Sequence, residues 1–151
     1  MAEAAILTEQ MRSQAIGNKG LPVTVEVEKG AILRFAQAIE DPNPLWNDEV
    51  QARKSRYGGL ITPPTFLRSL SYGRPPLPFD LPLERRLDGG SEWEYFEPVH
   101  PGDRITVVAE LVDMTERQGR LGPMVFLVFQ VTYTNQFGQV VATQRSTNIW
   151  Y

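Results

Sequence analysis

Strand-like alternation of apolar and polar residues fills most of the chain after Ser91, and it constrains the fold more than any other feature. Each alternating run predicts a half-buried β-strand. Turns at 115–122 and 136–138 separate the last three runs, as in an antiparallel meander. The predicted strands cover 91–96, 104–114, 124–134 and 140–150.

One face of this sheet is expected to form the core. Apolar side chains also occur on the opposite face of the run 104–114, which predicts a covering protein layer and hence an oligomer. The expected core set in this run is Ile105, Val107, Ala109 and Leu111, and the opposite set is Val108, Val112 and Met114.

The residues before Ser91 predict one strand, at 22–28, and several helices. Apolar residues at helical spacing indicate a helix over 32–40, which must stop before Pro42. Thr62 is the expected N-cap of another helix, with Pro63 in its first position. The Thr62 helix should reach Gly73, and further helices are expected at 3–16 and 48–54. The proline-rich segment 73–90 is predicted to be an irregular surface loop or a lid.

This order of elements predicts a single α+β domain over residues 1–151. About five antiparallel strands would wrap on one long helix, with an extra helix at the N-terminus.

Composition excludes several classes of function. With no cysteine, the chain has no disulfide, thiolate nucleophile or cysteine-bound zinc, and its one histidine, His100, makes a metal site unexpected. The net charge of −3 argues against nucleic-acid binding. No signal peptide or membrane-spanning stretch is evident, so a cytoplasmic protein is expected.

Three segments carry motifs. The first, residues 35–48, contains Asp41-Pro42-Asn43-Pro44-Leu45-Trp46, and the second, residues 57–66, contains Tyr57-Gly58-Gly59. The third is Pro98-Val99-His100-Pro101-Gly102-Asp103. Together they resemble the MaoC-like dehydratase family, with its motif G-D-x-N-P-[LIV]-H and its P-V-x-P-G-D strand entry, and in particular its N-terminal, FAS1-like dehydratase hotdog domain.

The resemblance implies a hotdog fold that binds a 2-enoyl or 3-hydroxyacyl thioester of coenzyme A or of acyl carrier protein, with no other cofactor. In family members that catalyse, the motif aspartate and histidine hold the water that adds to the double bond. A backbone N–H at a helix start polarises the thioester carbonyl.

The sequence departs from this pattern at two positions. Trp46 falls at the motif histidine, and an indole cannot shuttle protons near neutral pH. Pro64 falls at the oxyanion glycine and has no N–H to donate. Losing an acid–base group costs about 10²–10⁴ in rate, and losing one oxyanion donor costs about 10²–10³.

These departures resemble the non-catalytic half of double-hotdog hydratases. The first hypothesis is therefore a hydro-lyase subunit that pairs with a catalytic MaoC-like chain. A second is a self-sufficient homodimeric hydratase that uses Asp41 with Thr62, Thr65 or His100 as donor. A third is a non-enzymatic acyl-thioester-binding module.

Each candidate site residue has a structural alternative. Asp41 is a candidate catalytic carboxylate or a turn cap, and His100 a replacement base or a surface histidine. Arg74, Arg85 and Arg86 would meet the phosphates of the thioester carrier or remain solvated. The candidate substrate-binding residues are Asn43, Trp46, Tyr57, Gly58, Gly59 and Thr65, where turn, core or bend roles are the alternatives.

Overall fold

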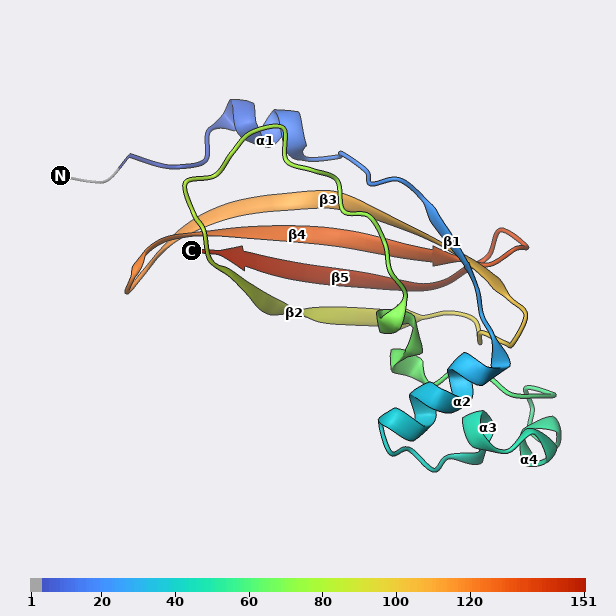
Figure 1. The fold of residues 1–151 in the computed structure, drawn as a ribbon. Helices are drawn as coiled ribbons and strands as arrows, with labels where there is room; N and C mark the ends of the chain where they lie inside the picture. Colours follow the sequence, from blue (N-terminus) through green and yellow to red (C-terminus); the bar gives the residue numbers. More distant parts are fainter. Residues whose placement is uncertain (1–3) are drawn as a thin grey trace.

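A computed structural model describes residues 4–151 (Figure 1). Its main feature is one five-stranded antiparallel sheet with the strand order β1-β3-β4-β5-β2. The strands are β1 (Val23–Glu26), β2 (Arg86–Tyr95), β3 (Arg104–Gly119), β4 (Gly122–Thr134) and β5 (Val140–Trp150). The expected number of strands and their antiparallel pairing are confirmed.

Two strand boundaries differ from the sequence prediction. β3 continues to Gly119 and β4 begins at Gly122, so only residues 120–121 form the turn that was expected over 115–122. β2 begins at Arg86, inside the segment that was predicted to be irregular, because Arg86–Asp88 pair with the end of β5. Cross-strand hydrogen bonds thus extend strands through residues whose local sequence favours turns.

A β-bulge in β3 moves Met114 into the core. The register with β4 shifts between Leu111 and Asp113, so the inward-facing residues change from odd to even positions. Met114 is completely buried, whereas Val108 and Val112 stay partly exposed on the outer face. The prediction that all three share the outer face is therefore wrong for Met114.

The helices are short. They are α1 (Glu9–Ala15), α2 (Lys29–Ala38), α3 (Pro44–Asn47), α4 (Glu49–Arg53) and a 3-10 helix, η1 (Pro64–Ser69). α1 begins at Glu9 because the Thr8 side chain accepts the Met11 N–H. The helix predicted over 3–16 is therefore wrong for residues 4–8, and residue 3 lies outside the described residues. α2 and α4 confirm the helices expected at 32–40 and 48–54.

The prediction of a long central helix is wrong. Only η1 forms where a helix was predicted from Thr62 to Gly73, and its N-cap is Pro63, without a side-chain cap. Thr62 instead lies before the helix, where its N–H donates to the Val99 carbonyl at 2.9 Å. Extended backbone at Leu70 ends the 3-10 turn, and the prolines that follow cannot continue a helix.

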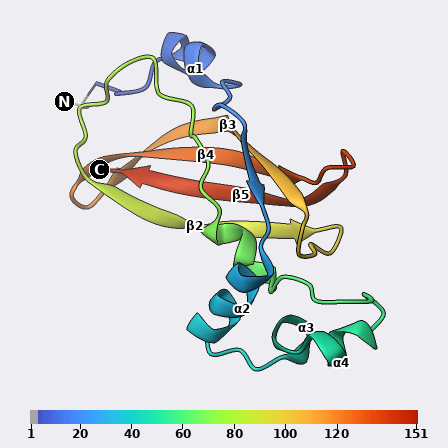
Figure 2. The same ribbon diagram turned by 45° about the vertical axis from the view of Figure 1, so that its right-hand side comes forward.

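An extended strap, residues 71–85, covers part of the sheet face in place of a long helix. Figures 1 and 2 show the strap leaving η1, crossing the sheet toward α1 and returning to the start of β2. Before Arg85, the strap backbone makes no hydrogen bond to the backbone of another described residue, and the Arg85 N–H donates to the Tyr151 carbonyl at 3.1 Å. Side-chain packing therefore holds most of the strap in place.

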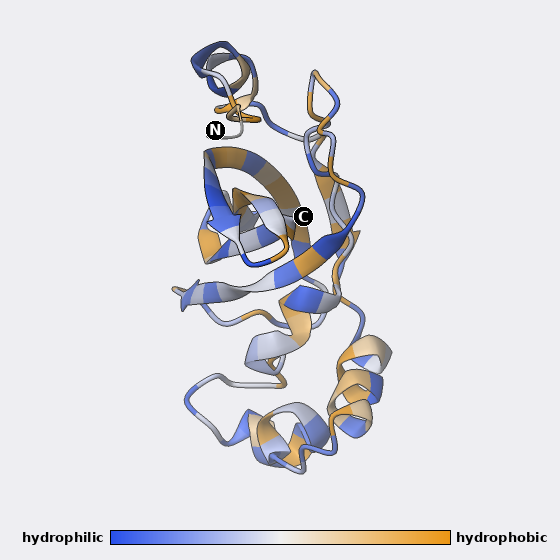
Figure 3. Cartoon of the chain, turned by 90° about the vertical axis from the view of Figure 1, so that its left-hand side faces the viewer, coloured by the Kyte–Doolittle hydropathy of each residue, from blue (hydrophilic) through white to orange (hydrophobic). Residues whose placement is uncertain are grey.

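Two apolar clusters share the buried face of the sheet, and Figure 3 shows apolar residues along the sheet and the elements that cover it. Short helices cover the first cluster, while α1 and the strap cover the second. Fully buried members of the first include Ile32, Ala36, Ile105, Val107, Val131 and Tyr133. The second comprises Leu7, Ala15, Leu111, Met114, Val125, Leu127 and Phe129, with Leu77, Phe79, Leu81 and Leu83 of the strap against it.

Gly20 and Gly73 hold the strap close to the chain that leads into β1. A Cβ atom at Gly20 would lie 1.9 Å from the carbonyl oxygen of Gly73, so only glycine permits this approach. Among residues 4–151, no helix is long and apolar enough to cross a membrane.

Candidate functional site

The segment 41–47 forms a turn fixed by its own side chains. Glu40, which follows the C-cap of α2, lies in the left-handed region at φ 55°. The Asp41 carboxylate then accepts the Asn43 N–H at 3.0 Å, and the Asn43 side chain accepts the Leu45 N–H at 3.0 Å. Asn47 donates to the carbonyls of Asp41 and Asn43 at 2.6 and 2.9 Å. Both candidate side chains, Asp41 and Asn43, thus make local turn contacts.

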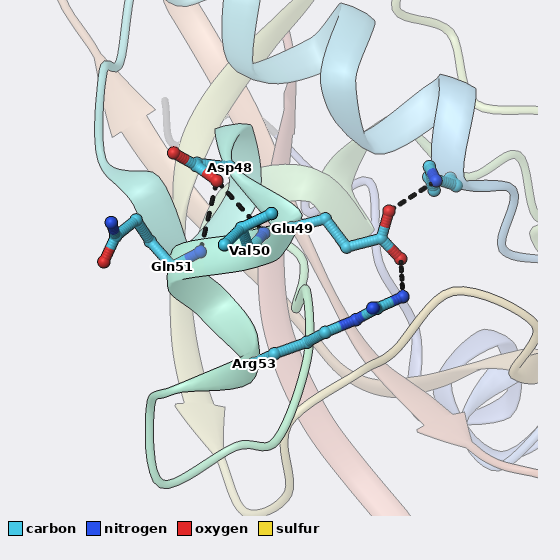
Figure 4. Close-up of polar contacts among 6 residues, drawn as sticks. Asp48, Glu49, Val50, Gln51 and Arg53 are labelled. Atoms are coloured by element: carbon cyan, nitrogen blue, oxygen red, sulfur yellow. Dashed lines mark hydrogen bonds and ion pairs between the residues drawn. The ribbon is translucent and has the colours of Figure 1, made fainter.

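A charged network anchors the next helix, α4, to α2 (Figure 4). The Asp48 carboxylate caps α4 by accepting the N–H groups of Val50 and Gln51. Glu49 lies between Lys29, at 2.7 Å, and Arg53, at 3.1 Å. The hydrogen bond from Lys29, together with its charge, lowers the pKa of Glu49 below its usual 4.5.

Trp46 projects from α3 into the first apolar cluster. Trp46 is only 8% exposed, and its buried Nε1 atom has no hydrogen-bond partner in the described part of the chain. The Ile61 N–H donates to the Leu45 carbonyl, which ties this turn to the segment before η1. The position of the motif histidine therefore lies within protein packing.

A groove of about 340 Å³ lies beside the start of η1 and the end of β2. Tyr57 lines it together with Thr62 and Pro64, and Arg56 lies over the Tyr57 ring and donates to its hydroxyl at 2.6 Å. The groove also exposes Tyr95 and Phe96. The candidate residues Asp41, Asn43, Trp46, Gly58, Gly59 and Thr65 do not line it.

Three other candidate residues, Gly58, Thr65 and His100, lie near this groove. Gly58 adopts φ 70°, a conformation that favours glycine, and Thr65 points to solvent on η1. The His100 ring contacts the Tyr57 carbonyl through Nε2 at 3.2 Å, and the His100 N–H donates to Asp103 at 2.8 Å. His100 therefore links the groove-lining segment to the entry of β3.

A second cavity, of about 460 Å³, lies between the strap and strands β4 and β5. None of the three sequence motifs pointed to this cavity. The available signal was the alternation of Leu77, Phe79, Leu81 and Leu83 with proline or aspartate, which marks an extended segment with one apolar side. The sheet contributes Leu127, Phe129, Asn148 and Trp150, and Arg74 and Arg86 also line the cavity.

A buried polar pair interrupts the apolar face of the sheet. The Tyr133 hydroxyl donates to Gln144 Oε1 at 3.2 Å, and Gln144 Nε2 donates to the Ser91 hydroxyl at 2.9 Å. Trp93 stacks on the Tyr133 ring, with centroids 5.4 Å apart. Burial raises the pKa of Tyr133, and the neighbouring Tyr72 raises it further.

The antiparallel sheet and its covering elements place the protein in the class of hotdog-like domains. The MaoC-like dehydratase from Rhodospirillum rubrum shares the fold with a TM-score of 0.72 and 26% identity, over 93% of this chain and 95% of that one. The C-terminally truncated HadBC (3R-hydroxyacyl-ACP dehydratase) complex from Mycobacterium tuberculosis is similar in fold, with a TM-score of 0.70 and 20% identity. That match covers 89% of this chain and 96% of the other.

Sequence similarity gives the family. The FAS1-like, dehydratase domain region matches residues 14–144. A UPF0336 protein of Saccharopolyspora erythraea is 33% identical over 129 residues, which are 81% of this chain and 79% of that protein. The chain therefore belongs to the FAS1-like dehydratase domain family, which confirms the resemblance found in the motifs.

Proposed function

We propose that this chain is the non-catalytic, acyl-thioester-binding half of an (R)-specific enoyl-thioester hydratase or 3-hydroxyacyl dehydratase, and that it works beside a catalytic MaoC-like chain. The observation that carries this proposal is Trp46, a buried indole at the position of the motif histidine.

Hydration of an enoyl thioester requires a group that accepts a proton from water and a donor that returns one at the α-carbon. The Trp46 indole cannot accept a proton, and its Nε1 faces neither solvent nor a polar partner. The Asp41 carboxylate makes a turn with Asn43. This supports a structural role for the motif segment in this chain.

The developing enolate oxygen requires a backbone donor, and Pro64 has no N–H to supply. η1 is a six-residue 3-10 helix. A short helix of this kind offers fewer aligned N–H groups than the long helix of the expected hotdog fold. The start of η1 is thus poorly suited to polarise a thioester carbonyl.

Acyl binding is supported by the cavity under the strap, whose walls are largely leucine and aromatic side chains. Its volume of about 460 Å³ lies within the range of about 300–1,000 Å³ for small-ligand sites. Because no long helix fills this face of the sheet, an apolar chain would find room there. We propose that the chain of the thioester extends into this cavity.

Assembly with a second chain is supported by β2, the long edge strand of the sheet. All of its residues except Trp93 are exposed, and its outer backbone groups have no strand partner among residues 4–151. Such an edge favours pairing with another strand. The HadBC structure, a 3R-hydroxyacyl-ACP dehydratase complex of similar fold, supports an arrangement of two unlike chains.

The proposal is tested by co-expression with a chain that carries an intact D-x-N-P-[LIV]-H motif, followed by purification of the complex and an assay of crotonyl-CoA hydration. Replacing the motif aspartate of the added chain by asparagine should lower the rate by about 10²–10⁴. The matched variant here, Asp41→Asn, keeps an oxygen that accepts the Asn43 N–H and should leave the rate unchanged.

The reverse result would contradict the proposal: a large loss with Asp41→Asn and little effect of the replacement in the other chain. Such an outcome would support the self-sufficient alternative. Circular dichroism of each complex shows whether a lost rate reflects lost structure.

A further inference from the structure

The cavity under the strap combines apolar walls with two arginine side chains. Arg74 lies at the start of the cavity-forming segment and Arg86 at the start of β2. Asp80 also lines the cavity, so its three charged side chains, two positive and one negative, carry a net charge of +1.

Both guanidinium groups lie on aromatic rings. The Arg74 Cζ atom is 5.2 Å from the Phe129 ring centroid, and the Arg86 Cζ atom is 4.1 Å from that of Trp150. Arg74 also donates to the Asn148 side-chain oxygen at 2.7 Å. These contacts fix the two cations beside the leucine and phenylalanine side chains of the cavity.

Within residues 4–151, neither arginine has a carboxylate partner. Among the described residues, the ion pairs involve only Arg12, Lys29, Arg53 and Arg68 as cations. A guanidinium is weakly hydrated, stacks on aromatic rings and still presents a planar set of N–H groups to a carboxylate. Two such groups beside the leucine and aromatic side chains of one cavity match a ligand that has an apolar chain and an anionic end.

We infer that this cavity binds an apolar chain that ends in a carboxylate, and that Arg74 and Arg86 hold that carboxylate. This deepens the proposed function, on which it rests for the identity of the apolar ligand. The carboxylate would belong either to a free fatty acid or to the far end of an acyl thioester, and the chemistry of recognition is the same.

The first measurement compares decanoate with 1-decanol, which has the same chain length and no charge, by titration calorimetry on the purified chain. The wild type should bind decanoate about tenfold or more tightly than decanol. The double variant Arg74→Gln/Arg86→Gln should lose this preference and keep decanol binding, whereas Arg74→Lys, which retains a cation, should keep part of it.

Arg117→Gln is the matched control. Arg117 is another guanidinium on an aromatic ring, 4.9 Å from the centroid of Phe126, but it does not line the cavity. This variant should leave both affinities unchanged. Leu81→Trp, which fills the cavity from the strap, should abolish binding of both compounds, and decanoate binding that survives it would place the site elsewhere and overturn the inference.

The failures are distinguishable. Equal binding of decanol and decanoate by the wild type overturns the carboxylate site and leaves the proposed acyl cavity intact. If the wild type binds neither compound, both the carboxylate site and the proposed acyl cavity are overturned. The activity of the complex then still tests the proposed hydratase role separately. Comparing decanedioyl-CoA with decanoyl-CoA shows where the carboxylate comes from. Tighter binding of decanedioyl-CoA that is lost in the double variant assigns the carboxylate to the far end of an acyl thioester. A preference for free decanoate alone assigns it to a fatty acid.

Discussion

The Tyr133 hydroxyl donates a hydrogen bond to Gln144 Oε1 across neighbouring strands β4 and β5, and both side chains are 0% exposed. Gln144 in turn donates to Ser91 on β2, so a chain of hydrogen bonds connects three strands and ends at an exposed serine. It lies on the sheet face that a long helix would cover in the expected fold. A polar group in this position is stable only while its partner remains.

Gln144→Leu should therefore destabilise the protein by about 1–3 kcal/mol, because the Tyr133 hydroxyl would stay buried without an acceptor. Tyr133→Phe should cost less, and adding it to Gln144→Leu should recover part of the loss. Denaturant unfolding of the two single variants and the double variant measures the coupling. Strictly additive losses would show that the pair contributes nothing as a pair.

Alkaline pH should destabilise the fold through Tyr133. Burial raises the pKa of its hydroxyl above the usual 10.0, so the folded state keeps a proton that the unfolded state loses. The resulting stabilisation is complete below pH 10 and is lost as the pH rises from 10 toward the folded-state pKa. Unfolding free energies measured across this range should fall less steeply for Tyr133→Phe, and parallel curves would argue against the raised pKa.

The close approach of Gly20 to Gly73 should make Gly20→Ala strongly destabilising. The added Cβ would meet the Gly73 carbonyl at 1.9 Å, so the strap or the segment before β1 must move. Gly59→Ala is the matched control, since a Cβ there meets no atom within 4 Å. Thermal unfolding should show a lower Tm for the first variant and little change for the second; equal Tm values would mean that the strap does not lie where the structure has it.

Glu49 should titrate below its usual pKa of 4.5, because Lys29 and Arg53 stabilise the charged carboxylate. A lowered folded-state pKa gives a stabilisation that is present above the unfolded-state value and is lost as the pH falls through the folded one. NMR titration of the side-chain carboxyl measures this directly. In Lys29→Gln the value should move back toward 4.5, whereas Arg12→Gln, which removes a cation of another ion pair, should leave it unchanged.

Sequence patterns that involve only neighbouring residues predicted the structure best. Alternation located β3, β4 and β5, and the residues Asp41 to Pro44 predicted a turn that the hydrogen bonds of Asp41 and Asn43 form. The motif segments also identified the family. In each of these cases, the information lies within a few neighbouring residues.

Features that depend on distant contacts were missed. The bulge that buries Met114 arises from pairing with β4, and the early start of β2 arises from pairing with β5. The helix expected after Thr62 is reduced to η1. The strap then covers the sheet through packing of Leu77 and Phe79, which local propensity does not encode.

The structure does not bring the candidate site residues together in one cavity. Tyr57 does line a groove, together with Thr62 and Pro64, but Trp46 lies in the core. Arg74 and Arg86 were expected either to meet phosphates or to remain solvated. Their stacking on Phe129 and Trp150 depends on the folded sheet and could not be read from the sequence.

The rate of crotonyl-CoA hydration by the purified, folded chain alone shows whether this chain carries the groups for hydration. We expect no rate above that of buffer, and activity only after a chain with the intact motif is added. Robust turnover by the isolated chain, abolished by Asp41→Ala, would contradict it.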